Sequence, residues 1–198
     1  MAALPGARDP HSDDAPRALH GRPADLSPRR VLVAVASRHG ATRDIARAIG
    51  DRLETGGTGL QVVVLPVDQR PDPVLYDAVI LGSAVYAGRW LEPARTYAAA
   101  HAAVLRSKAV WLFSSGPIGE APFPPDEPHD AGPLTQVTGA VEHRVFPGRL
   151  DKRLLGVGER AMVTAMRAPL GDFRDWTAVR DWADEIARQL ASASAVLR

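Results

Sequence analysis

Three short segments of the sequence combine glycine with hydroxyl or aromatic residues, a composition typical of loops that bind small molecules. The first runs from Ser37 through His39, Gly40 and Ala41 to Thr42. It follows an apolar run and opens a helical pattern, so successive backbone N–H groups and hydroxyls would meet at a helix N-terminus, which suits a phosphate dianion. The alternative is an ordinary turn in which Thr42 caps the helix.

The other two segments also follow apolar runs. From Gly82 to Trp90, small residues stand beside the two large rings of Tyr86 and Trp90, which suits an aromatic heterocycle with backbone groups at its edge. Alternatively, both rings only cover the start of the following helix. The third segment, from Ser114 to Gly119, combines Ser, Gly and Pro in an order that lets backbone amides face a ligand, or it forms a simple turn.

Regular elements must position these loops. Apolar runs at 31–36, 60–65, 78–81 and 109–113, and a fifth near 141–146, alternate with helical patterns at 42–53, 92–105 and 176–190. Asp172 or Asp175 would cap the last helix. Strands that are apolar on both faces predict an α/β fold with a doubly wound, five-stranded parallel sheet. Ligands bind at the carboxyl ends of such strands, where all three loops fall.

Two segments interrupt the alternation: a proline-rich loop over 116–133 and an insert over 149–170 before the last helix. Residues 1–29 carry repeated prolines and mixed charges and are expected to form a disordered tail, and residues 30–192 one folded domain.

Composition narrows the function. The chain has 198 residues, a formal net charge of +1 and no cysteine. The charge gives no general electrostatic case for binding nucleic acid, and six scattered histidines without cysteine make a metal site unexpected. No apolar stretch is long enough to span a bilayer, and the N-terminus lacks the apolar core of a secretory signal, so a cytoplasmic protein is expected.

Four segments in order carry a family resemblance: 36–42 (ASRHGAT), 81–88 (LGSAVYAG), 146–151 (FPGRLD) and 172–176 (DFRDW). They resemble the flavodoxin-like FMN-binding family, and more specifically its menaquinone-dependent protoporphyrinogen oxidase branch and the flavodoxin-domain relatives of that branch. The resemblance implies the strand order 2-1-3-4-5 and an FMN cofactor. The residues that it assigns to FMN are Ser37, His39, Gly40, Ala41, Thr42, Ser83, Ala84, Val85, Tyr86, Ala87, Gly88, Ser115, Gly116, Pro117 and Gly119. Of these, His39 is expected to contribute its backbone N–H rather than its ring.

The insert from Arg149 to Leu170 interleaves apolar and basic residues. Such a segment can lie on an anionic membrane surface, at the inner face of the membrane, or close over an apolar substrate. The alternative is a helix packed on the domain with a solvated arginine face.

The resemblance therefore implies an FMN-dependent oxidoreductase, with a porphyrinogen and a quinone as the substrate pair. No side chain is assigned as a catalytic acid or base, because His101, His129 and His143 have no carboxylate or serine at catalytic spacing. Two alternatives stay open: a flavodoxin-type electron carrier without its own substrate, and a flavin-less relative that acts as a binding module.

Overall fold

The structure is a computed structural model that describes residues 29–57, 59–116, 128–165 and 169–196. Its central sheet has five parallel strands in the spatial order β2-β1-β3-β5-β6. The doubly wound fold and the strand order 2-1-3-4-5 are thereby confirmed. The strands are β1 (Arg30–Ala36), β2 (Gln61–Pro66), β3 (Ala78–Tyr86), β5 (Ala109–Ser115) and β6 (Glu142–Phe146), and the short β4 (Arg89–Trp90) pairs antiparallel with the end of β3.

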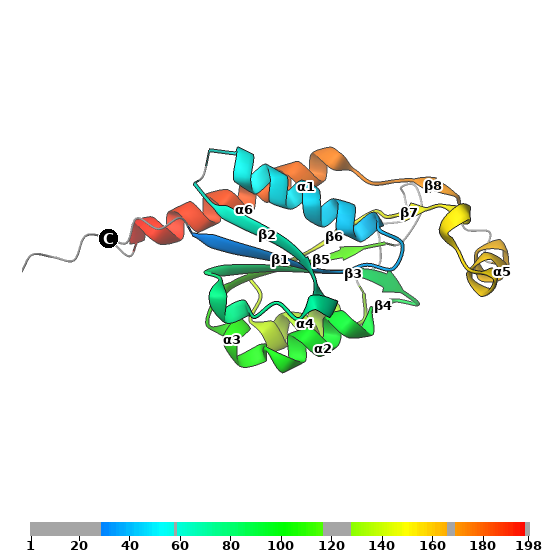
Figure 1. The fold of residues 1–198 in the computed structure, drawn as a ribbon, viewed down its shortest axis with the longest axis horizontal. Coiled ribbons are helices and arrows are strands. Elements are labelled where there is room, and N and C mark those ends of the chain that lie inside the picture. Colours follow the sequence, from blue (N-terminus) through cyan, green and yellow to red (C-terminus); the bar gives the residue numbers. More distant parts are fainter. Residues whose placement is uncertain (1–28, 58, 117–127, 166–168, 197–198) are drawn as a thin grey trace, which may run out of the picture.

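Helices cover both faces of the sheet (Figure 1). One face carries α1 (Ala41–Thr55) and α6 (Trp176–Val196), and the other carries α2 (Glu92–Ala100), α3 (Ala102–Arg106) and α4 (Ala131–Thr138). Short 3-10 turns, η1 (Val67–Gln69) and η2 (Pro73–Leu75), connect β2 to β3. Asp175 begins α6, because its carboxylate accepts hydrogen bonds from the Thr177 and Ala178 N–H groups, each over 2.9 Å.

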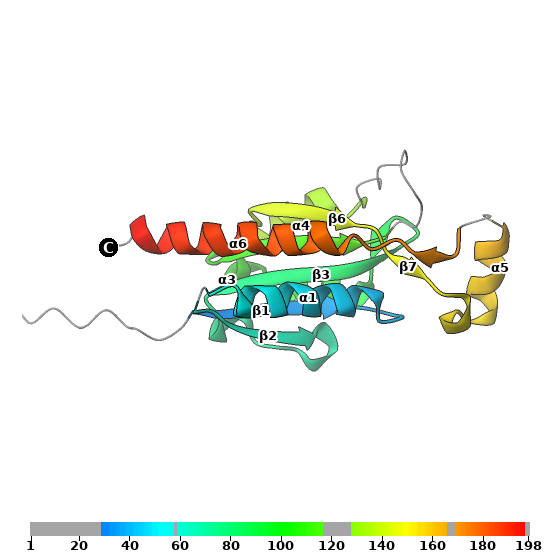
Figure 2. The ribbon, with the colours of Figure 1, turned by 90° about the horizontal axis from the view of Figure 1, so that it is seen from above.

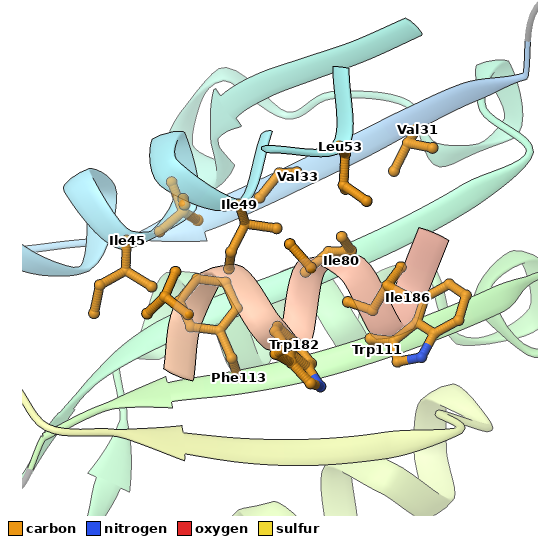
Figure 3. Close-up of a cluster of buried hydrophobic side chains, with 14 of the residues drawn as sticks. Val31, Val33, Ile45, Ile49, Leu53, Ile80, Trp111, Phe113, Trp182 and Ile186 are labelled. Atoms are coloured by element: carbon orange, nitrogen blue, oxygen red, sulfur yellow. The ribbon is translucent and has the colours of Figure 1, made fainter. Parts of the chain in front are cut away.

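The core consists of two layers, one on each side of the sheet. Alternate side chains of β1 point to opposite faces: Val31, Val33 and Val35 pack with α1 and α6, whereas Leu32 and Ala34 pack with the other layer. Figure 3 shows the first layer, in which Ile45 and Ile49 of α1 face Trp182 and Ile186 of α6 across the sheet side chains. Full burial of an aliphatic side chain contributes about 1.5–3 kcal/mol, so these runs fix the sheet between the helices.

Aromatic residues fill the end of this layer nearest the strand ends. The Trp182 ring meets Phe146 edge-on at 5.5 Å and Phe113 at 6.2 Å. Trp111 and Trp182 are buried in the core, and Trp176 packs at the border of the cluster.

The structure differs from the expected pattern at β3, which continues five residues beyond the predicted end at residue 81. Gly82 pairs with Val35 of β1 on one side and with Phe113 of β5 on the other, so pairing on both edges holds this stretch extended. The second loop is therefore the end of a central strand and a tight turn at Ala87 and Gly88, both with positive φ.

Two helical regions also differ. The helix expected over 92–105 is divided at His101, whose φ of −108° and ψ of 13° end α2 before α3 begins. The predicted loop over 116–133 overlaps the start of α4, which sequence patterns did not indicate. Proline is tolerated in the first turn of a helix, so Pro133 does not prevent α4, and Gly139 ends it in the left-handed conformation.

The insert forms a small unit of its own beyond the sheet. Strand β7 (Arg149–Leu150) pairs antiparallel with β8 (Gly171–Asp172), and η3 (Lys152–Leu154) and α5 (Val157–Ala165) lie between them. Figures 1 and 2 show α5 past the carboxyl edge of the sheet, away from the layers of helices. The alternative of a helix packed on the domain is therefore wrong. At the opposite end, the Arg29 guanidinium donates to the Leu190 carbonyl over 2.6 Å and joins the start of β1 to α6.

Candidate functional site

The first predicted loop connects β1 to α1. Gly40 immediately precedes the helix with a φ of 87°, and its N–H donates to Ser37 Oγ over 3.1 Å. Because α1 begins at Ala41, the residue at the cap position is Gly40, and the alternative in which Thr42 caps the helix is wrong. No side chain caps this helix in the described part of the chain, so its first N–H groups remain available to a ligand.

Thr42 lies in the first turn of α1 and is 2% exposed. Its hydroxyl makes no hydrogen bond with another described residue, unlike the helical hydroxyls of Thr55 and Thr138, which donate to carbonyls four residues back. The first loop thus offers free backbone donors and one uncommitted hydroxyl at a helix N-terminus, which is the donor set that a phosphate requires.

Strand register brings the three predicted loops together. Ala36, the last residue of β1, pairs with Ser83, and Ala84 pairs with Ser115 at the end of β5. The residues that follow these pairs therefore leave the sheet side by side at its carboxyl edge. Gly116 has a φ of 114°, and a Cβ atom added to it would lie 3.6 Å from the Val85 carbonyl oxygen, so the second and third loops are in close approach.

The second loop presents Ala84, Val85, Tyr86, Ala87 and Gly88 at this edge. The Ser83 hydroxyl is buried and committed within the protein: it donates to the Ala84 carbonyl and accepts from the Leu91 N–H over 3.0 Å. Ser115 is buried and Gly116 donates its N–H to the Phe146 carbonyl. The remaining predicted residues of the third loop, Pro117 and Gly119, lie outside the described residues.

An ion pair that sequence reasoning missed connects the insert to the first loop. Glu159 of α5 places its Oε1 atom 3.1 Å from Arg38 Nε and 3.2 Å from His39 Nε2. A hydrogen bond from the Gly156 N–H, then those from His39 and the charge of Arg38, hold the pKa of Glu159 below its ordinary value. The His39 ring is thus directed to the insert.

Tyr86 lies beside this ion pair. The Arg38 guanidinium is 5.5 Å from the centre of the Tyr86 ring, and the His39 ring is 6.3 Å away. Burial, and then the negative charge of Glu159, raise the pKa of Tyr86, so the phenol is neutral at physiological pH. The side chains that meet around Tyr86 therefore come from the first loop, the second loop and the insert.

A second missed contact supports the start of α1. Arg174, which follows β8, is 6% exposed and places Nη1 3.0 Å from Asp44 Oδ2 and Nη2 2.5 Å from Asp172 Oδ2. Asp44 is in the first turn of α1, where its charge would repel a bound anion. Arg174 neutralises that carboxylate and joins the base of the insert to the helix.

A third contact holds β4 in place. Trp90 Nε1 donates to Ser114 Oγ over 2.7 Å, and His143 Nε2 lies 2.8 Å from the same oxygen. The sequence predicted neither of these partners for Ser114, because three separate elements supply them. Buried Trp90 and Ser114, with half-buried His143, support the hairpin that carries Tyr86 and Gly88.

The described residues contain neither a metal site nor a membrane-spanning helix. Within these ranges no group of three or more His, Asp or Glu side chains is placed to hold a metal ion. In the same part of the chain, none of the helices has the length and apolar character needed to traverse a bilayer.

Fold and loops together define the class of protein: a doubly wound α/β protein whose three candidate binding loops converge at the carboxyl edge of the sheet, with an insert anchored to the first of them. The chain belongs to the flavodoxin-domain family, whose model, described as "Flavodoxin domain", matches residues 32–177. None of the curated proteins matches the chain.

Solved structures agree on the fold. A flavodoxin from the domain Archaea is 14% identical, with 82% of this chain and 99% of that chain covered and a TM-score of 0.54. A flavodoxin from Streptococcus pneumoniae is 17% identical, with 83% and 99% covered and a TM-score of 0.50. The rubredoxin oxygen:oxidoreductase of Desulfovibrio gigas is 14% identical, with 84% of this chain but only 37% of that chain covered and a TM-score of 0.53. At these identities the likeness concerns the fold alone.

Proposed function

We propose that the protein binds FMN at the carboxyl edge of its sheet and acts as a redox flavoprotein. The observation that carries this proposal is the start of α1, which no described side chain caps. There Gly40 turns the chain, and the Thr42 hydroxyl makes no hydrogen bond to another described residue. A single phosphate fits this donor set, and membership of the flavodoxin-domain family supports it.

Each loop has a distinct task in this proposal. The loop from Ser37 to Thr42 holds the phosphate with backbone N–H groups and hydroxyls, while Arg174 keeps Asp44 neutralised behind it. The end of β3 from Ala84 to Gly88 and the start of the third loop at Ser115 and Gly116 flank the ring system. FMN, when bound, supplies the electron-transfer chemistry, and the protein binds it, orients it and sets its electrostatic surroundings.

Substitutions in the first loop test this assignment by FMN titration of the apoprotein, followed by flavin fluorescence. Thr42→Ala should weaken FMN binding about fivefold, because it removes one hydrogen bond worth about 1 kcal/mol. Gly40→Val should weaken it more, because a branched side chain at positive φ distorts the turn.

The controls are matched to the two substitutions. Thr55→Ala removes a hydroxyl from the other end of α1, and Gly57→Val places valine at another glycine of positive φ with no neighbour within 4 Å of its Cβ position. Both should retain wild-type FMN affinity. Undiminished affinity in both first-loop variants would contradict the phosphate assignment.

We further propose that the flavoprotein is an enzyme that oxidises a porphyrinogen and passes the electrons to a quinone. The resemblance in four segments supports this activity, and the insert provides it with an apolar surface near the site. In the described part of the insert, Leu154 is 45% exposed, Leu170 51% and Val157 88%, whereas Leu155 is 7% exposed and buried. A flavodoxin-type electron carrier and a flavin-less binding module remain the alternatives.

Replacing Leu154 and Val157 together with Ser separates the enzyme from the carrier. If these side chains contact an apolar substrate or an anionic membrane, porphyrinogen-dependent quinone reduction should fall at least tenfold while FMN affinity is retained. The reason is that each CH₂ buried in such a contact contributes about 0.8 kcal/mol. Vesicles of anionic lipid, added to the assay and co-sedimented with the protein, separate the membrane from the substrate. An electron carrier would show no porphyrinogen turnover in either form and would still exchange electrons with a redox protein.

A further inference from the structure

A cavity of about 480 Å³ lies in the insert, between β7, η3 and β8. Its lining combines the cationic side chains of Arg149, Lys152 and Arg153 with the apolar Leu150 and Leu170. Charged groups predominate in this open hollow, so its chemistry favours a ligand that carries a charged group. This one is separate from the three strand-end loops described above.

The charges in the cavity are not balanced. Two carboxylates also line it, but each is already paired with the arginine two residues further on: Asp151 with Arg153 at 2.9 Å, and Asp172 with Arg174 at 2.5 Å. By contrast, neither the Arg149 guanidinium nor the Lys152 ammonium makes a hydrogen bond or an ion pair to any residue that the structure describes. The charge of Arg149 does act on both Asp151 and Asp172. Three cations against two carboxylates still leave the lining with a net positive charge for an anionic ligand.

The cavity lies next to the third loop. A Cβ atom added to Gly148 would be 3.5 Å from the backbone of Gly116, and Arg149, the first lining residue, follows directly. The Phe173 N–H donates to the Gly148 carbonyl over 3.1 Å and ties the return strand of the insert to the same point. The cavity therefore adjoins the third loop at the carboxyl edge of the sheet.

We propose that this cavity binds the carboxylate groups of the apolar substrate, with Arg149 and Lys152 as their counterions. A guanidinium forms paired hydrogen bonds with a carboxylate, an ammonium adds a point charge, and the half-exposed Leu170 contacts the adjoining apolar body. This inference rests on the proposed oxidoreductase function. It assigns the cavity to the porphyrinogen, an apolar macrocycle that carries carboxylates, and not to a quinone, which carries none.

The test compares protoporphyrin IX with its dimethyl ester, which has the same macrocycle without the charges. Porphyrin fluorescence is titrated with the full-length, FMN-loaded protein in the absence of lipid. The wild type should bind the diacid at least tenfold more tightly than the diester, and added salt should reduce that difference. Arg149→Gln and Lys152→Gln should each weaken diacid binding about tenfold and leave diester binding unchanged.

One control accompanies these variants. Arg188→Gln, on α6 away from the insert, removes a positive charge and should change neither affinity. Retained FMN affinity and thermal unfolding show that each variant is folded.

The outcomes separate this inference from the proposed function. If acid and ester bind alike, or if the acid binds only when anionic vesicles are present, the inference is overturned, even where porphyrinogen turnover occurs. If the diacid is preferred and the two variants lose that preference, the inference stands, even where no porphyrinogen turnover is found and the proposed activity fails.

Discussion

Replacing Arg174 with Met should destabilise the fold far more than an equivalent change on the surface. The guanidinium is 6% exposed, bridges Asp44 of α1 and Asp172 of β8, and lies 4.4 Å from the centre of the Trp176 ring. The substitution preserves much of the side-chain length while it removes every polar contact. It therefore isolates the charge from the packing.

The expected magnitude follows from the exposure of the partners. Breaking a fully buried ion pair costs about 3–5 kcal/mol. Asp44 and Asp172 are 37% and 43% exposed, so water resolvates both carboxylates and the expected loss is smaller, about 2 kcal/mol in the free energy of unfolding at pH 7. The lost contact with Trp176 contributes about 0.5–1 kcal/mol of that sum.

Urea unfolding of the full chain measures this effect, with an unchanged slope showing that the denatured state is unaffected. Arg153→Met is the matched control, because Arg153 forms the same pair with an aspartate two residues earlier but is 89% exposed. It should leave the free energy of unfolding unchanged. Equal effects of the two substitutions would refute the reasoning.

The same pair predicts a pH dependence. The hydrogen bond from Arg174 holds the pKa of Asp172 below its ordinary value of about 4. The stabilisation is therefore complete above that ordinary value and is lost as the pH falls through the lower pKa of the folded state. Arg174→Met should flatten this acid limb of the stability profile, which urea unfolding between about pH 5 and pH 2 would record. An unaltered acid limb would mean that the Asp172 pair does not contribute.

Two further predictions concern the fold. Gly82→Ala should lower the free energy of unfolding in urea by about 1–3 kcal/mol, because the new Cβ would lie 2.1 Å from the buried Phe113 ring. Gly132→Ala, whose Cβ would have nothing within 4 Å, should be neutral or stabilising. Similar values for both would contradict the packing argument. Removing residues 1–28 should leave the melting temperature and FMN affinity unchanged, because that stretch has no periodic apolar face; a large loss of either would show that it contributes to the domain.

The sheet was predictable from the sequence because its strands are buried on both faces. Val31 to Ala36 is apolar without interruption, which a parallel strand between two helical layers requires. The extension of β3 was not predictable in this way. The stretch from Gly82 to Val85 is small and glycine-containing, and it is extended because β1 and β5 pair with it from both sides.

The contacts that shape the candidate site could not be predicted from the sequence, for a different reason. Glu159 and His39 are 120 positions apart, and Arg174 and Asp44 are 130 apart. A charged residue on a helix is by default a solvated one, and only the folded chain shows which charge meets which. The first-loop pattern, by contrast, is contiguous, so the sequence alone locates it at the start of α1.

The hydrogen bond between Arg29 and Leu190 has a practical consequence for attaching the protein to a surface. It joins the start of β1 to α6 at the amino edge of the sheet, and Figure 1 shows α6 ending at the opposite end of the molecule from α5. A linker fused before β1 or after α6 would therefore attach the domain through the amino edge of its sheet. On an electrode, each attached molecule would present its three strand-end loops and the insert to the solution. Soluble reactants would then reach these loops freely, whereas the loops would lie a full domain length from the conducting support.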